Sequence, residues 1–148
     1  MRIIIQKALA SSVTIDGETV GQIDKGFVLL VGVTHDDTEA DVQYCANKIS
    51  KMRLFEDEEG KINLSLEQVG GELLSISQFT LFANTSKGNR PSFIEAAKPE
   101  HAERLYHLFN EQLRSQGFKV ATGEFGAMMQ VHIVNDGPVT ILLDSKNK

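Results

Sequence analysis

The stretch Gly26-Phe27-Val28-Leu29-Leu30-Val31-Gly32-Val33 contains no polar side chain. A short, continuous apolar run of this kind, rich in Val and Leu and opened by glycine, is typical of a strand that is buried on both faces. We therefore predict a central strand at residues 27–33, with the rest of the chain arranged around it.

Two further strand patterns precede this run. Residues 2–9 are rich in β-branched side chains and form a short segment, which favours a buried strand over a helix. Residues 12–15 and 19–23 flank the pair Asp16-Gly17, and Asp-Gly between two such segments is typical of a β-hairpin. We therefore expect a hairpin within residues 12–23.

After the central run the apolar residues take the spacing of a helix. Thr38 is a suitable cap, acidic Asp41 lies near the expected helix start, and basic residues lie near its end. The apolar positions of this helix are Val42, Cys45, Ala46, Ile49 and Met52. A second helix is expected from Pro99 to just before Gly117, because Pro is favoured inside a helix start and Gly past its end. Its apolar face contains Ala102, Leu105, Phe109 and Leu113.

The remaining segments predict mainly short strands. A turn at residues 58–60 separates Leu54-Phe55 from residues 62–64, a strand is expected from Glu72 to Phe82, and residues 84–92 form a polar loop. Further strands are expected near residues 118–121, 128–134 and 139–144. The prediction is one α+β domain over residues 1–148, with a curved, barrel-like, mostly antiparallel sheet and two main helices packed outside it.

Composition and charge exclude several classes of protein. The chain has 148 residues and a net charge of −5, which argues against a basic nucleic-acid coat or a polybasic membrane binder. Its single cysteine, Cys45, excludes an internal disulfide, and no apolar segment has the length of a signal sequence or a membrane span. We expect a soluble, cytoplasmic protein with no membrane partner and no DNA partner.

The sequence lacks the patterns of common metal, nucleotide and triad sites. None of His35, His101, His107 and His132 lies at metal-ligand spacing from another His or from Cys45, and no glycine-rich phosphate loop occurs. We therefore expect neither a metal nor a cofactor. His101 and His107 are expected to face solvent, and Cys45 is expected in the core. A conventional Ser-His-Asp or Cys-His enzyme is not supported.

Residues 73–82, Leu-Leu-Ser-Ile-Ser-Gln-Phe-Thr-Leu-Phe, place polar and large apolar side chains on both faces of the expected strand. Each buried polar group needs a partner or costs about 1–3 kcal/mol. In one interpretation the hydroxyls bond to neighbouring strands and Gln78 lies at an edge. In the other, a pocket at the strand's end is lined by Ser77, Gln78, Phe79 and Thr80.

Residues 131–141 also allow two interpretations. Asp136-Gly137 between apolar runs is typical of a hairpin turn. Pro138, however, removes a hydrogen-bond donor where the next strand would begin. The alternative is a binding loop made of backbone, in which a cis bond before Pro138 would fix two adjacent carbonyl groups in a rigid display.

At these two segments the sequence resembles the D-aminoacyl-tRNA deacylase family. Ser77-Gln78-Phe79-Thr80-Leu81 and Asn135-Asp136-Gly137-Pro138-Val139-Thr140 resemble the two signature motifs of that family. The similarity extends over residues 1–6, 10–18, 53–57, 90–93 and 122–129. Two motifs in order, within a full-length similarity, make a specific signal.

The resemblance implies a cofactor-independent hydrolase acting in translation quality control. Its substrate would be the ester that joins a D-amino acid, or glycine on a non-cognate tRNA, to the 3′-terminal ribose of tRNA. The implied catalytic residues are Ser77, Gln78, Phe79 and Thr80. Phe125 and Met129 match positions that flank the terminal adenosine.

The resemblance also implies a homodimer with shared sites. A cis Gly137-Pro138 loop of one subunit would enter the pocket of the other, bind the α-ammonium group through carbonyl oxygens and exclude L side chains. Lys7 departs from the family, which often has an arginine there that braces this loop. Lysine keeps the positive charge but lacks the planar fork of arginine.

Several hypotheses of mechanism and function remain open at this level. Backbone N–H groups near Phe79 and Thr80 are candidate oxyanion donors, and the substrate's own 2′-hydroxyl is the preferred activator of water over a Thr80 nucleophile. The alternatives to the deacylase are a non-catalytic dimeric module that binds a small molecule and a nonspecific esterase. Local positive charge for RNA comes from Lys87, Arg90 and Lys98, opposed by Glu95.

Overall fold

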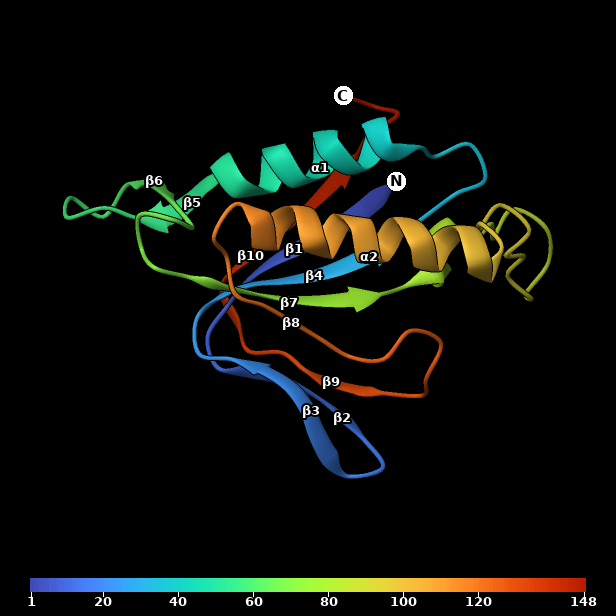
Figure 1. Ribbon diagram of the computed structural model, residues 1–148, viewed down its shortest axis with the longest axis horizontal. Coiled ribbons are helices and arrows are strands. Elements are labelled where there is room, and N and C mark those ends of the chain that lie inside the picture. Colours follow the sequence, from blue (N-terminus) through green and yellow to red (C-terminus); the bar gives the residue numbers. More distant parts are fainter.

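The computed structural model describes residues 1–148 as two α-helices, one 3-10 helix and ten strands (Figure 1). In chain order the elements are β1 Arg2–Ala8, β2 Ser11–Ile15, β3 Glu18–Ile23, β4 Gly26–Gly32, α1 Glu39–Lys51, β5 Arg53–Glu56, β6 Ile62–Ser65, β7 Glu72–Ser77, η1 Phe79–Phe82, α2 Pro99–Ser115, β8 Val120–Thr122, β9 Gln130–His132 and β10 Asn135–Asp144. Neither α-helix is long and apolar enough to cross a membrane.

The strands form three sheets arranged in layers. A five-stranded sheet has the order β10-β1-β4-β7-β8, a smaller sheet has the order β3-β2-β9, and β5 pairs with β6. Both α-helices cover one side of the five-stranded sheet, and the smaller sheet lies on the other side (Figure 1). Five of the seven strand pairings are antiparallel, which confirms the predicted α+β class, although no barrel closes.

The apolar run at the centre of the sequence is the middle strand, β4, as predicted. Phe27, Leu29 and Val31 point toward the helices, whereas Val28 packs in the second core, against the smaller sheet. Because a strand alternates its side chains between two faces, a strand covered on both faces favours apolar residues at successive positions.

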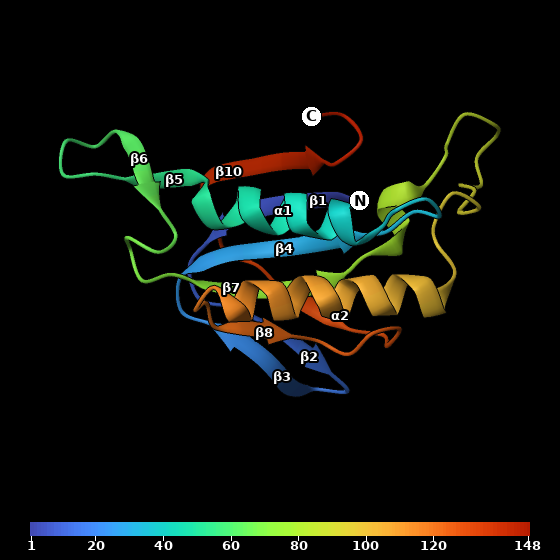
Figure 2. The same cartoon turned by 45° about the horizontal axis from the view of Figure 1, so that its top comes forward.

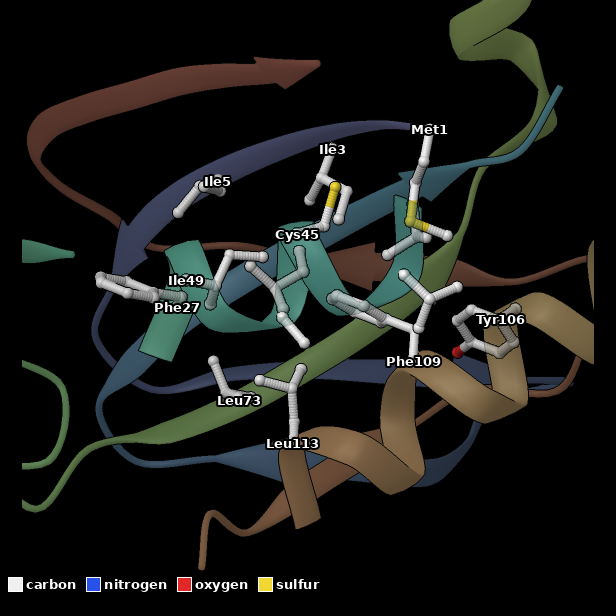
Figure 3. Close-up of a cluster of buried hydrophobic side chains, with 14 of the residues drawn as sticks. Met1, Ile3, Ile5, Phe27, Cys45, Ile49, Leu73, Tyr106, Phe109 and Leu113 are labelled. Carbon is white, nitrogen blue, oxygen red and sulfur yellow. The ribbon is translucent and has the colours of Figure 1, made fainter. Parts of the chain in front are cut away.

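The main core lies between the five-stranded sheet and the two helices (Figure 3). Cys45 of α1 is fully buried there, which confirms its predicted place. Burial raises the pKa of the Cys45 thiol to about 12, so this side chain is an apolar filler rather than a nucleophile. The start of α1 also follows the prediction, since the Thr38 hydroxyl caps the amide of Ala40 and the Asp41 carboxylate caps Thr38.

Two local predictions were wrong, and one of the two interpretations of residues 131–141 is excluded. The strand expected from Glu72 to Phe82 ends at Ser77, because β4 ends at Gly32 and the Leu81 amide donates to the Gln78 carbonyl (3.2 Å), which turns the chain into η1. No hairpin turn forms at Asp136-Gly137, because these residues belong to β10, which pairs with β1, while β9 pairs with β2. His101 is half-buried rather than solvent-facing, and its Nε2 is 2.9 Å from the Asp37 carbonyl oxygen.

Candidate functional site

A cavity of about 710 Å³ lies where β4 and β7 end, between η1, the start of α2 and the segment that joins β8 to β9. Its lining is mainly apolar and contains Lys98 as a charged side chain, with no carboxylate, imidazole or thiol. A cavity of this size and character is typical of sites that bury a small organic molecule. Apart from the Lys98 ammonium group and the Ser77 hydroxyl, acid–base chemistry in it therefore has to come from the ligand, from water or from backbone groups.

The first wall of the cavity is the turn that follows β7. Ser77, Gln78 and Phe79 line the cavity, and the chain turns because the Gln78 carbonyl accepts from the Leu81 amide (3.2 Å). The side-chain amide of Gln78 donates to the Thr80 hydroxyl oxygen (2.6 Å). Thr80 is exposed and lies beside the cavity rather than in its lining.

The second wall comes from the segment between β8 and β9. Phe125 and Met129 both line the cavity. Gly123 allows this arrangement, because a Cβ atom there would lie 2.3 Å from the Met129 sulfur. The Phe125 ring in turn packs at 6.1 Å, between ring centroids, from the ring of Tyr106 on α2.

A third wall was missing from the sequence analysis. Phe93 lines the cavity and meets Phe79 edge-on, with ring centroids 5.2 Å apart. The loop that carries it is anchored to the end of β4, where the Ala97 amide donates to Val33 (2.9 Å) and His35 Nε2 lies 2.6 Å from the Ile94 carbonyl oxygen. These contacts join segments about 60 residues apart, so no local pattern predicts them.

The structure thus brings five of the eight predicted site residues into one cavity lining, with Thr80 adjacent. The five are Ser77, Gln78, Phe79, Phe125 and Met129. Gly137 and Pro138 are not among the lining residues.

Gly137 and Pro138 form part of an exposed bulge in β10. Four residues, 136–139, stand opposite the single residue Lys7 of β1, since Gln6 pairs with Thr140 and Ala8 pairs with Asn135. The Asn135 side-chain amide closes the bulge by donating to the carbonyl oxygens of Lys7 and Val139, each at 2.9 Å. The Gly137–Pro138 peptide bond is cis, and both residues are exposed.

Lys7 lies beneath this bulge and is largely buried. Its ammonium nitrogen is 3.6 Å from a carboxylate oxygen of Asp136, the residue before Gly137. The lysine therefore contacts the bulge through an ion pair with Asp136, and through its own carbonyl group, which accepts from Asn135.

The bulge lies at the start of β10 and the cavity lies at the ends of β4 and β7, which are opposite ends of the five-stranded sheet. Figure 2 shows the start of β10 and the arrowhead of β4 at these opposite ends. The cavity is next to Val31, which pairs with Ile3, whereas the bulge is next to Ala8. Five residues of strand separate these two positions by about 16 Å, and two strand spacings add about 10 Å sideways. The bulge of a chain therefore does not reach the cavity of the same chain.

Residues 4–144 match the protein family described as D-Tyr-tRNA(Tyr) deacylase. The chain is 58% identical, over 146 residues, to the D-aminoacyl-tRNA deacylases of Bacillus cereus (strain G9842) and Anoxybacillus flavithermus (strain DSM 21510 / WK1). These alignments cover 99% of this chain and 100% of each relative.

Two solved structures are also similar. The c-Myc DNA Unwinding Element Binding Protein superimposes with a TM-score of 0.91 and 42% identity, over 97% of this chain and 98% of that chain. A probable eukaryotic D-amino acid tRNA deacylase superimposes with a TM-score of 0.83 over 96% of this chain and 97% of that chain. At 17% identity the second similarity shows the fold.

Proposed function

The chain belongs to the D-Tyr-tRNA(Tyr) deacylase family, and on this premise we propose that it hydrolyses the ester bond of D-aminoacyl-tRNA and releases the D-amino acid. The observation that carries the proposal is the shared cavity of the Ser77-Gln78-Phe79 turn and the Phe125–Met129 wall. Its volume of about 710 Å³ suits an adenosine that carries an amino acid.

The chemistry follows from the groups that line the cavity. The aminoacyl ester is an activated bond, and no lining side chain is a carboxylate, imidazole or thiol that could act as a base. We assign the activation of water to the 2′-hydroxyl of the terminal ribose, which lies next to the ester bond in the substrate itself. The N–H groups of Phe79 and Thr80 open the 3-10 helix η1, where backbone donors have no partner within the helix, and they are suited to stabilise the oxyanion.

Thr80 is a poor candidate for a covalent nucleophile. Its hydroxyl oxygen accepts a hydrogen bond from the Gln78 amide, and an amide cannot take up the hydroxyl proton. A serine or threonine nucleophile needs an adjacent base. We assign Thr80 the role of anchoring the Gln78 side chain at the mouth of the cavity.

The proposed enzyme is a homodimer in which each cavity is completed by the Gly137-Pro138 bulge of the partner subunit. This arrangement is supported by the separation of the bulge from the cavity of its own chain and by the exposure of both residues. Backbone carbonyl groups at the tip of the bulge would accept from the α-ammonium group of the substrate. An L side chain would then point at main chain, whatever its type, whereas glycine would be hydrolysed.

The tRNA would be recognised mainly through its 3′ end. Lys98 lines the cavity, and Lys87 and Arg90 lie on the adjoining polar loop, all exposed. The net charge of −5 disfavours a broad contact with the phosphate backbone. Binding should therefore depend weakly on salt concentration, because few counterions are released.

The test is parallel deacylation of D-Tyr-tRNA and L-Tyr-tRNA by the purified protein and by a Pro138→Ala variant. Rapid loss of the D ester alone supports the activity, and a weaker preference in the variant places chiral selection in the bulge. Equal loss of both esters would leave a nonspecific esterase. A folded dimer that cleaves neither ester would be the non-catalytic binding module.

A further inference from the structure

We infer that Tyr106 of α2 is a positioning residue for this site: its hydroxyl group holds the end of β7, and its ring supports the opposite wall of the cavity at Phe125. The inference rests on the proposed function and extends it to a side chain that does not line the cavity. It connects the turn that carries Ser77, Gln78 and Phe79 with the wall that carries Phe125 and Met129.

The first contact is a buried hydrogen bond from helix to strand. The Tyr106 hydroxyl donates to the backbone carbonyl oxygen of Ser75 at 2.6 Å, and both residues are buried. Ser75 stands opposite Thr122, the last residue of β8, so the neighbouring strand ends at this point. The Tyr106 hydroxyl therefore bonds to β7 at the last residue that pairs with β8. This residue, Ser75, lies two positions before Ser77.

Other buried polar atoms lie on the same residue, Ser75, and one helical turn further along α2, at Asn110. The Ser75 hydroxyl oxygen and the Asn110 side-chain oxygen are also buried there, and neither has a hydrogen-bond partner. Burial raises the pKa of the Tyr106 phenol, so the group remains a protonated donor over the physiological range. Loss of the hydroxyl would leave the Ser75 carbonyl as a further buried polar group without its donor.

The second contact is made by the aromatic ring of Tyr106, which packs against Phe125. The rings of Tyr106 and Phe125 are 6.1 Å apart between centroids and inclined at 41°, which is a favourable aromatic arrangement. Figure 3 shows Tyr106 on α2 at one end of the buried core cluster, in line with Phe109 and Leu113. The ring of Tyr106 is therefore held in place by the core. From this position Tyr106 contacts one wall of the cavity through Phe125 and supports the other through Ser75.

Loss of the Tyr106 hydroxyl should therefore affect turnover but not substrate binding. Replacing Tyr106 by Phe removes the hydrogen bond to β7 but keeps the ring against Phe125. The turn at residues 77–80 should lose its exact placement, and a misplacement of about 1 Å can cost about a hundredfold in rate. The adenosine wall should remain, so the affinity for the 3′ end should not change.

The experiment compares Tyr106→Phe with Tyr44→Phe by steady-state kinetics on D-Tyr-tRNA. Tyr44 is the other tyrosine of the chain, and its ring lies on α1 beneath the ammonium group of Lys148, outside the cavity lining. We expect kcat to fall by about tenfold to a hundredfold in Tyr106→Phe, with KM within about twofold of the unaltered protein. Tyr44→Phe should match the unaltered protein in both parameters.

Amide hydrogen exchange supplies a readout that does not depend on activity. In Tyr106→Phe, peptides that cover residues 75–82 should exchange faster, while those that cover α1 should not. Unchanged kcat, or exchange that rises equally in all peptides, would overturn the positioning role. An unaltered protein without deacylase activity would instead overturn the proposed function, and faster exchange confined to residues 75–82 would still support the physical contact.

Discussion

Gly32, the last residue of β4, lies so close to Gln78 that a Cβ atom on the glycine would be 3.1 Å from the Gln78 carbonyl oxygen. The same atom would be 3.0 Å from Cβ of Leu81. Both neighbours are backbone or first side-chain atoms, which cannot rotate away. The absence of a side chain at residue 32 therefore lets the η1 turn pack against the end of β4.

The Gly32→Ala substitution should impair activity more than stability. Its methyl group should push η1 outward by a few tenths of an ångström and lower kcat by about tenfold. The lower entropy of alanine in the unfolded chain should offset part of the strain, so the free energy of unfolding should change by less than about 1 kcal/mol. Deacylation kinetics and urea denaturation measure the two effects, and full activity in the variant would contradict the packing argument.

The Thr80→Ala substitution should retain most of the deacylation rate. Because the hydroxyl has an amide rather than a base as its partner, its removal should disturb only the orientation of Gln78 and lower kcat by less than about tenfold. Single-turnover deacylation of D-Tyr-tRNA measures this. Loss of nearly all turnover, with the melting temperature unchanged, would restore Thr80 as the nucleophile.

A mixture of two defective variants should regain activity if the sites are shared between subunits. One variant carries Phe79→Ala in the cavity and the other carries Pro138→Ala in the bulge. In a mixed dimer one site combines both changes and the other has neither. Random re-association of equal amounts should therefore give about a quarter of the unaltered D-specific activity. Activity equal to the mean of the two parent variants would mean that each chain builds its site alone.

Asp41 should make stability depend on pH in the acid range. Burial of its carboxyl group acts to raise the pKa, but hydrogen bonds from the Ser145 hydroxyl and the Thr38 amide, and the Lys146 ammonium group, outweigh it and hold the pKa well below its usual range. Such a group stabilises the fold above its unfolded pKa of about 3.9, and this contribution is lost as the pH falls toward the folded value.

The Asp41→Asn variant should therefore lose about 2–4 kcal/mol at pH 7 and show a flatter stability profile below pH about 4. Urea denaturation at several pH values measures both quantities. If the free energy of unfolding of the variant falls with pH as steeply as that of the unaltered protein, other carboxyl groups cause the acid sensitivity.

Cys45 should be inert in the folded protein. Its thiol is fully buried and its pKa is raised to about 12, so a thiol reagent at pH 8 should react only after unfolding in denaturant. Since the folded pKa is higher than the unfolded one, the stabilising contribution is complete below pH about 8.5 and is lost as the pH rises toward 12. The Cys45→Ala variant should lack this part of the alkaline transition, and rapid labelling of the native protein would contradict the burial argument.

The sequence by itself determined the elements whose cause is local. The apolar run at residues 27–33 defined a strand covered on both faces, Thr38 and Asp41 defined a helix start, and Asp16-Gly17 defined a hairpin. These features depend on the side-chain period and on capping groups within a few residues. The sequence motifs also named five of the residues that line the cavity.

Tertiary structure decided where these elements stop and what they meet. The amide of Gln78, at the end of β7, bonds to Val31 of β4, which lies 47 residues earlier in the chain. The pairing partner of the Gly137-Pro138 segment is β1 rather than its neighbour β9. The bond from Tyr106 to Ser75 likewise joins residues 31 apart. Hydrogen bonds between distant segments form only once the sheet has brought them together, so no local pattern in the sequence encodes them.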